Sequence, residues 1–546
     1  MYRGRIVSWD DARPMSTAMA VQDGRVVALG GEAEALAGDA GEREDFGAAY
    51  LFPGFHDAHC HTTAFGLSLG QLDVSSPPVS SLDDVYAVVA GGAAAADSEG
   101  RRHDWVIGSG YDQNKLGGQH PSRAALDAAA GDHPVWLTHT SGHMCVVNSA
   151  TLALIGPRLD EPIEGGVVLR DPAGAPTGLL QERAQGLVRD LVLPRSLESI
   201  AQAIGDAHDR YLSEGITSVC DAGIGGGWIG QSPLELAAYQ LARDTGRLKV
   251  RSTVMLSSDL LEPIVGHADD FPGAVPVRGL PAGLRSGLGD DRLRLGPVKV
   301  FSDGSLIGRT CWMEHGFDDD PANTGFPQAD PERLRSLIIG AHLAGWQVAT
   351  HAIGDAAVRF VLDCYEEALS LVPRDDHRHR IEHCGITPSD SLQRLVDLGV
   401  VPVPQGRFIG EIGDGMLAAL GPERAAYAYR LRSFLEAGIV LPGSSDRPVV
   451  DGRPLLGIAD MVRRSTQSGA PFAEGEALTA EQAMRAYSAG SAHAERTERE
   501  RGSLRLGQLA DFVVLADDPR AVDPIDIASV PVIATSVGGR IAHDAR

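Results

Sequence analysis

Strand-like and helix-like segments alternate through the middle of the chain, and this pattern constrains the fold more than any other feature. Helix-like stretches, such as 331–344 and 355–371, separate eight short apolar runs. The apolar runs span residues 51–61, 216–221, 250–256, 295–302, 347–351, 380–383, 400–404 and 439–445. A parallel barrel requires this alternation. We therefore predict an α/β fold centred on a (β/α)8 TIM barrel.

The two ends of the chain have a different pattern. Residues 1–50 read as short strands with a hairpin-like turn at 22–24, and further strand-like runs occupy 511–515 and 532–535. Short isolated strands are barely stable alone. We therefore predict that residues 1–50 and 500–546 pair into one small β-sandwich beside a barrel domain of residues 51–499.

The gap between the first two predicted strands is too long for a single helix. It covers about residues 65–205 and contains short segments punctuated by Gly and Pro. Loops that follow barrel strands build the active sites of such folds. We therefore predict an inserted subdomain that roofs the pocket.

Charge and composition narrow the range of partners. The 546 residues carry a formal net charge of −25, which disfavours nucleic acid and anionic membranes. We find no run of about 18 apolar residues, no signal-peptide core at the start and no disulfide framework among six scattered cysteines. We expect a cytoplasmic protein with a small-molecule substrate, no nucleic-acid or membrane partner, and a homodimeric assembly.

The strongest local motif ends the first predicted strand. Alternation along a strand places Asp57, His59 and His61 on one face. Two imidazoles at this spacing can chelate one cation. The motif alone is also compatible with ordinary polar positions.

Four later strands also end in residues that can bind metal: Lys299, His351, His383 and Asp446. Each has a plainer interpretation, as a buried histidine, a helix cap or an ion-pair partner. Their succession in barrel order favours a shared metal site. Lys299 is also one of only three lysines in the chain, and lysine, unlike arginine, can lose its proton when buried.

Together these motifs resemble the amidohydrolase superfamily, and in detail its "amidohydrolase 3" branch, which includes N-substituted formamide deformylases. The resemblance spans nearly the whole chain. Its supporting stretches are 53–61, 105–112, 134–149, 174–180, 215–220, 299–305, 351–355, 381–383 and 507–515.

The resemblance implies a role for each candidate residue. His59 and His61 match ligands of one metal, and His351 and His383 match ligands of a second. Lys299 matches the position that is carboxylated in many relatives and bridges both metals, and Asp446 matches a ligand that also acts as acid and base. We expect two divalent ions, with Zn favoured and Mn, Fe and Co compatible with such ligands.

Further residues are candidates for supporting roles. Asp57 is expected to orient an imidazole or to be purely structural. His143, Tyr111, Asp112 and Gln405 are candidate substrate contacts, and Tyr111 stands where the family usually has Trp.

Arg447 departs from the small residue that the family resemblance leads us to expect. With Arg407 it could bind a substrate carboxylate, but an ordinary ion pair is favoured for both.

These features predict hydrolysis of a linear amide-type C–N bond, in an N-substituted formamide or an N-acyl amine. A hydroxide shared by two metals would attack the carbonyl, with Asp446 moving the proton. A deaminase or lactonase on the same scaffold is the alternative. Deaminases of the superfamily usually carry a Glu near the fifth-strand His, and His351 has none. A non-catalytic metal-binding relative is the third reading.

Overall fold

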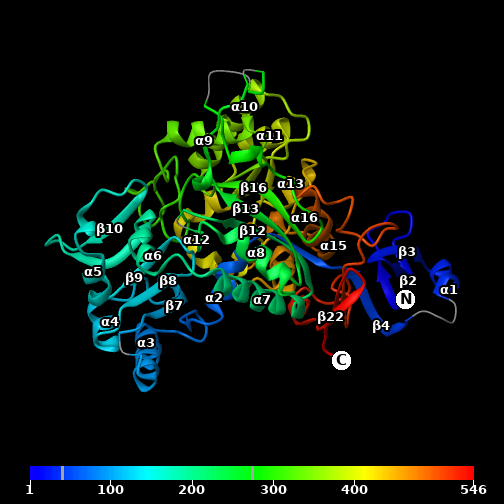
Figure 1. Cartoon of the computed structure of the whole chain (residues 1–546), viewed down its shortest axis with the longest axis horizontal. Helices are drawn as coiled ribbons and strands as arrows, with labels where there is room; N and C mark the ends of the chain where they lie inside the picture. Colours follow the sequence, from blue (N-terminus) through cyan, green and yellow to red (C-terminus); the bar gives the residue numbers. More distant parts are fainter. Residues whose placement is uncertain (38–41, 102, 228, 268, 272–275) are drawn as a thin grey trace.

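The computed structural model describes residues 1–37, 42–101, 103–227, 229–267, 269–271 and 276–546. Within these ranges, seven parallel strands form the central sheet in the order β19-β18-β17-β16-β13-β12-β5 (Figure 1). The strands are β5 Phe55–Cys60, β12 Ile216–Ile224, β13 Arg251–Ser257, β16 Leu293–Phe301, β17 Val348–Ala352, β18 Arg380–His383 and β19 Val401–Val403. This nearly closed sheet confirms the prediction of a TIM-type barrel.

The prediction of an eighth strand at 439–445 is wrong. Gly443 O accepts from Ala58 N at 3.0 Å and Asp446 N donates to His59 O at 2.7 Å, so the segment does run beside β5. However, Gly443 N donates to Ala486 O instead of to a strand, and Pro442 has no N–H to donate. The segment therefore fills the eighth position without forming a ladder.

Helices cover the outside of the barrel (Figure 1). They include α7 Leu197–Ser213, α8 Glu235–Asp244, α9 Pro331–Leu343, α10 Asp355–Leu371, α11 Ser389–Leu398, α12 Arg407–Ala425, α14 Pro454–Arg463 and α15 Ala480–Arg485. The main core lies between strands and helices, where Val254 and Val298 join Ile204 and Val361 in one buried cluster. No helix in the described ranges has the length and apolar character needed to cross a membrane.

Strands from both termini pair into a single seven-stranded sheet, in the order β22-β21-β20-β4-β1-β2-β3. Its members are β1 Tyr2–Val7, β2 Met15–Gln22, β3 Arg25–Leu29, β4 Glu44–Pro53, β20 Phe512–Leu515, β21 Val532–Val537 and β22 Arg540–Asp544. The predicted run 51–61 is thus two strands, because the chain passes from this sheet to the barrel at Gly54, where Thr217 leaves no room for a Cβ. A two-layered sandwich remains a prediction.

Between β5 and β12 the chain builds a separate six-stranded sheet, ordered β10-β11-β9-β8-β7-β6. Its strands are β6 Leu72–Asp73, β7 Val106–Tyr111, β8 Val135–His139, β9 Met144–Val147, β10 Gly166–Arg170 and β11 Pro176–Glu182. The helix α6 Gly186–Val192 follows it. We call residues 72–192 the insert; in Figure 1 its cyan elements lie on the side of the barrel opposite the terminal sheet. The domain limits 65–205 remain a prediction.

Candidate active site

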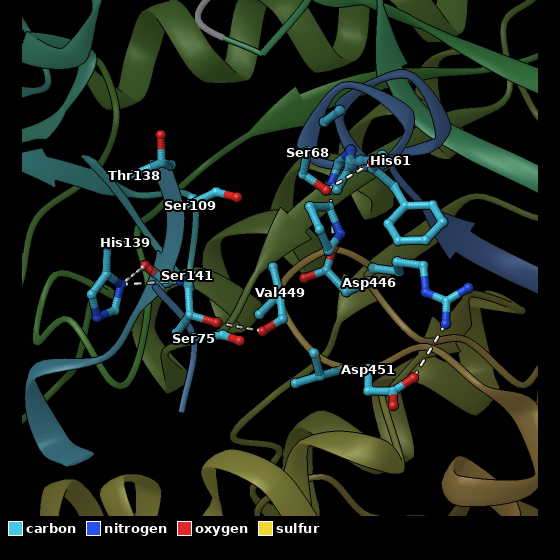
Figure 2. A pocket seen from close by; sticks show the side chains of 18 of the residues that line it. His61, Ser68, Ser75, Ser109, Thr138, His139, Ser141, Asp446, Val449 and Asp451 are labelled. Carbon is cyan, nitrogen blue, oxygen red and sulfur yellow. Dashed lines mark hydrogen bonds and ion pairs between the residues drawn. The ribbon is translucent and has the colours of Figure 1, made fainter. Parts of the chain in front are cut away.

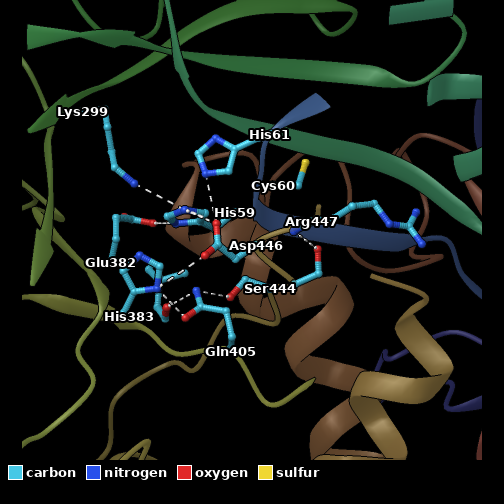
Figure 3. A network of polar contacts seen from close by, with 12 residues as sticks. His59, Cys60, His61, Lys299, Glu382, His383, Gln405, Ser444, Asp446 and Arg447 are labelled. Carbon is cyan, nitrogen blue, oxygen red and sulfur yellow. Dashed lines mark hydrogen bonds and ion pairs between the residues drawn. The ribbon is translucent and has the colours of Figure 1, made fainter. Parts of the chain in front are cut away.

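Polar side chains from β5, β16, β18 and the segment that fills the eighth position meet at one point of the barrel rim (Figure 3). Oδ1 of Asp446 lies 3.2 Å from Nε2 of His59 and 3.0 Å from Nε2 of His61. Nζ of Lys299 lies 3.3 Å from the same Nε2 of His59. These contacts join residues that lie as much as 387 positions apart in sequence.

His383 and His351 complete the group. The His383 ring lies 5.0 Å from that of His59 and 4.5 Å from that of His351, centroid to centroid. All six residues predicted as ligands therefore lie around one site. The structure also shows why His383 faces it: its backbone φ of 67° leaves the strand conformation at the end of β18.

This donor set fits a divalent metal. Ligand atoms of His59, His383 and Asp446 all lie within 4.8 Å of one another. Within the described chain, the buried Nδ1 of His61 has no hydrogen-bond partner, and Oδ1 of Asp446 meets only the imidazole nitrogens of His59 and His61. Burial lowers the pKa of His61 to about 4, which keeps its imidazole neutral. Neutral imidazoles and a carboxylate are the donors that Zn and similar cations bind.

Lys299 lies inside the barrel, only 1% exposed. Burial lowers its pKa to about 8, although the carboxylates of Glu382 and Asp446 partly oppose this. A larger fraction of the amine is therefore neutral than in an exposed lysine. Such an amine can react with carbon dioxide, whereas a guanidinium cannot.

Glu382, which the sequence analysis did not single out, orients His59. Its Oε2 forms a short hydrogen bond with Nδ1 of His59. Arg380 donates to both Glu382 oxygens, at 2.7 and 2.9 Å. This pairing leaves Nε2 of His59 facing the site. The position of Glu382 next to His383 was the only sequence signal for its role. However, alternation along β18 predicts that one of these two residues faces away from the site.

Asp57 does not contact an imidazole ring. Its carboxylate accepts from His59 N and Ser445 N, both at 3.1 Å, and from the Ser445 hydroxyl. It thus fastens β5 to the segment that fills the eighth position. The expected orienting role belongs to Glu382, and the structural alternative fits Asp57.

His351 and His383 are also fixed by neighbours. Nε2 of His351 lies 3.1 Å from Gly304 O and 3.3 Å from Oδ1 of Asp303. Asp303 itself accepts backbone N–H groups, including that of Gly354 at 2.9 Å. Nδ1 of His383 lies 2.7 Å from Oε1 of Gln405. Gln405 therefore positions a ligand, and its contact with substrate stays a prediction.

The insert contributes His143 to the site. Its ring lies 5.1 Å from that of His351, centroid to centroid. Nδ1 of His143 lies 2.7 Å from the fully buried Glu182, which also accepts from Gln328 at 2.7 Å. Burial lowers the pKa of His143, but the Glu182 carboxylate outweighs it and the net shift is upward. Glu182, at the end of β11, was not predicted.

Tyr111 and Asp112 lie behind the cavity wall. Tyr111 is fully buried against the ring of His139, 5.0 Å away. Asp112 caps the turn that follows β7 by accepting from Asn114 N at 2.9 Å. Neither residue lines the cavity, so their contact with substrate stays a prediction.

Arg447 and Arg407 line the cavity but are paired with carboxylates. Arg447 donates to both oxygens of Glu214, at 2.6 and 3.2 Å. Arg407 bonds Asp460 at 2.5 Å and Glu411 at 2.7 Å. Both arginines therefore form ion pairs within the protein, as the favoured interpretation of the sequence predicts.

A cavity of about 950 Å³ opens above the donor group. Figure 2 shows His61 and Asp446 on its barrel side, facing Thr138, His139 and Ser141 from the insert. A small organic molecule could therefore reach Asp446 while touching both parts of the chain.

Comparisons with known proteins find similarity over nearly the whole chain. The sequence model described as "Amidohydrolase family" matches residues 45–543. The protein LONG AFTER FAR-RED 3 of Arabidopsis thaliana is 31% identical over 98% of this chain and 90% of its own. The N-substituted formamide deformylase of Arthrobacter pascens is 27% identical, covering 98% and 96%.

Among solved structures, an uncharacterized metal-dependent hydrolase from Pyrococcus horikoshii OT3 superposes with a TM-score of 0.73 and 25% identity. The similarity covers 96% of this chain and 98% of that one. With the family match over nearly the full length, these comparisons show that the chain belongs to the amidohydrolase family.

Proposed function

We propose that the protein is a metal-dependent hydrolase of a linear amide-type C–N bond, in an N-substituted formamide or an N-acyl amine. One observation carries the proposal: four histidines and Lys299, from the ends of β5, β16, β17 and β18, lie around the buried carboxylate of Asp446 beside the cavity. The likeness to an N-substituted formamide deformylase and to a metal-dependent hydrolase supports it.

Asp446 is the proposed acid and base. When bound, divalent cations supply a water of lowered pKa and polarise the scissile carbonyl. Neighbouring imidazoles hold the pKa of Asp446 well below its usual value, against the effect of burial. Its carboxylate is therefore ionised, accepts a proton from the attacking water, and returns it to the leaving nitrogen. This role is worth about 10²–10⁴-fold in rate.

Lys299 is the proposed bridge between two metal ions. Its Nζ lies 3.3 Å from Nε2 of His59, and its strand, β16, lies between β13 and β17 in the sheet. Carboxylation would convert the neutral amine into an anionic ligand with two oxygens. We propose two ions, with Zn as the favoured metal.

The insert is proposed to roof the site. His143 faces His351 from the insert, and Glu182 holds one ring nitrogen. We propose that the His143 ring donates to the carbonyl oxygen of a small substrate as negative charge develops there.

The test is turnover by metal-loaded and metal-stripped protein on a panel of N-substituted formamides and N-acyl amines. Release of amine only by the loaded protein is expected. Amine release by a metal-free protein, or turnover confined to amidines, aminopurines or lactones, would contradict the proposal. The latter result would favour the deaminase or lactonase alternative.

A further inference from the structure

Two groups of arginines that line the cavity differ in their partners. Arg407, Arg447 and Arg453 all belong to ion pairs, the last with Asp451 at 2.9 Å. Their charges are therefore already balanced by the protein. Any anionic group of a substrate would compete with these carboxylates.

Arg189 and Arg195 form the second group. Both line the cavity at the end of the insert, Arg189 on α6 and Arg195 just after it. In the part of the chain that the structure describes, neither forms an ion pair with a carboxylate, and the buried Nε of Arg195 has no hydrogen-bond partner. Arg189 donates to the carbonyl of Gly230. Burial lowers the pKa of Arg189 to about 10 and also that of Arg195, because the nearby carboxylates do not offset desolvation.

Glu235, the carboxylate with the largest electrostatic effect on Arg189, is buried and bonded to backbone N–H groups. It accepts Gly225 N at 3.0 Å and Gln231 N at 2.8 Å. These bonds hold the loop after β12 rather than an arginine. Within the described chain neither guanidinium is hydrogen-bonded to a carboxylate, although the charge of Glu235 partly opposes the effect of burial on the pKa of Arg189.

The loop after β12, which contacts both arginines, begins beside Lys299. Arg189 bonds Gly230, and Arg195 N donates to Gln231 O at 3.1 Å. The preceding Ile229 packs on Gly223, where an added Cβ would lie 3.6 Å from Cγ of Lys299. The two arginines thus line the same cavity wall as the proposed bridging lysine.

We propose that Arg189 and Arg195 form a subsite for a substrate carboxylate, so that the enzyme acts on N-acyl or N-formyl amino acids. This inference rests on the proposed function and specifies its substrate class. A guanidinium offers paired N–H donors that match the two oxygens of a carboxylate. The acyl C–N bond would then lie over Asp446 while the carboxylate reaches the arginines.

The experiment compares N-formylalanine with N-formylalaninamide, in both enantiomers, on metal-loaded protein. The two substrates differ only in the negative charge. We expect kcat/KM to favour the acid by at least about tenfold. Arg195→Met and Arg189→Met should each lower kcat/KM for the acid by about 10- to 100-fold, the range for a lost charged hydrogen bond. The same substitutions should lower kcat/KM for the amide by less than about threefold, because the amide has no carboxylate to form the charged hydrogen bond.

Two further variants sharpen the result. Lys115→Met removes another cation that lines the cavity, and should leave the preference for the acid intact. Arg195→Lys keeps the charge but not the paired donors, and should retain part of the preference. Equal kcat/KM for acid and amide in the wild type, or equal losses for both in the arginine variants, would overturn the subsite.

Calorimetric binding of N-methanesulfonylalanine and its amide, which carry no hydrolysable acyl bond, separates this proposal from the proposed function. Arg195-dependent preference for the acid without any turnover would uphold the subsite and overturn hydrolysis. Hydrolysis of the amide without such preference would uphold hydrolysis and overturn the subsite. Absence of both binding and turnover would overturn both.

Discussion

The barrel rim and the insert contribute to the same cavity in different ways. At the rim, His59 is held by Glu382, which in turn is held by Arg380, so each donor has a fixed direction. The insert presents His143 with one supporting carboxylate. Arg189 of the insert and Arg195 just after it form no ion pair with a carboxylate among the described residues. This contrast suggests that the rim provides the chemistry and the insert provides substrate choice.

Asp446→Asn should have the largest effect on catalysis at the rim. An amide at this position cannot accept the proton, so we expect kcat to fall by about 10²–10⁴-fold. Steady-state kinetics with the best formamide substrate measures this, and metal content by mass spectrometry checks occupancy. A variant that keeps its metal and more than about a tenth of the wild-type kcat would contradict the acid–base role.

Glu382→Gln should weaken metal binding by about 10- to 100-fold, because the carboxylate orients His59. Competition with a chelator measures the affinity. The matched control is Asp57→Asn, since Asp57 contacts backbone and Ser445 but no ring. Equal effects of the two substitutions would show that the orienting role has been assigned to the wrong carboxylate.

His143→Gln should test the insert with a smaller effect, about tenfold or more in kcat/KM, as for a lost hydrogen bond to developing charge. Metal content should not change, because His143 is not one of the six proposed ligands. Glu182→Gln should follow the same trend, since Glu182 fixes the His143 ring. Loss of metal in His143→Gln would instead indicate that this histidine is a metal ligand.

The smallest effect concerns stability. Asp221 of β12 is buried and bonded to the Tyr239 hydroxyl, and burial, with help from Glu235, raises its pKa to about 8. A raised carboxyl pKa stabilises the fold at low pH, and this stabilisation is lost as pH rises from about 4 to about 8, with a slope of up to about 1.4 kcal/mol per pH unit. Asp221→Asn should remove that dependence.

Urea unfolding of metal-stripped proteins at pH 5 and pH 8 measures the difference. The exposed Asp526→Asn serves as the control, and should follow the wild type. Parallel pH dependence of wild type and Asp221→Asn would show that Asp221 titrates normally.

The order of the ligands could be predicted from the sequence because each of them lies at or near the end of a barrel strand or, for Asp446, of the segment that fills the eighth position. His59, Lys299, His351 and Asp446 needed only that order and their chemistry to be placed together. His383 was placed correctly too, although strand alternation does not explain its direction, which depends on a positive φ.

Other features depend on contacts between distant segments and could not be predicted. Glu382 bonds the His59 ring although their strands, β18 and β5, are not neighbours in the sheet. The eighth strand fails because Gly443 bonds a helix carbonyl. The pairing of Arg447 with Glu214 joins residues 233 positions apart.

Metal content per chain, measured by plasma mass spectrometry on wild type and Lys299→Ala grown with added zinc, tests the central claim most directly. The account predicts about two ions in the wild type, as in two-metal hydrolases, and one or fewer in the variant. About one ion in both proteins would contradict the bridging role of Lys299 and favour a mononuclear enzyme, while a metal-free wild type would contradict the metal-dependent mechanism itself.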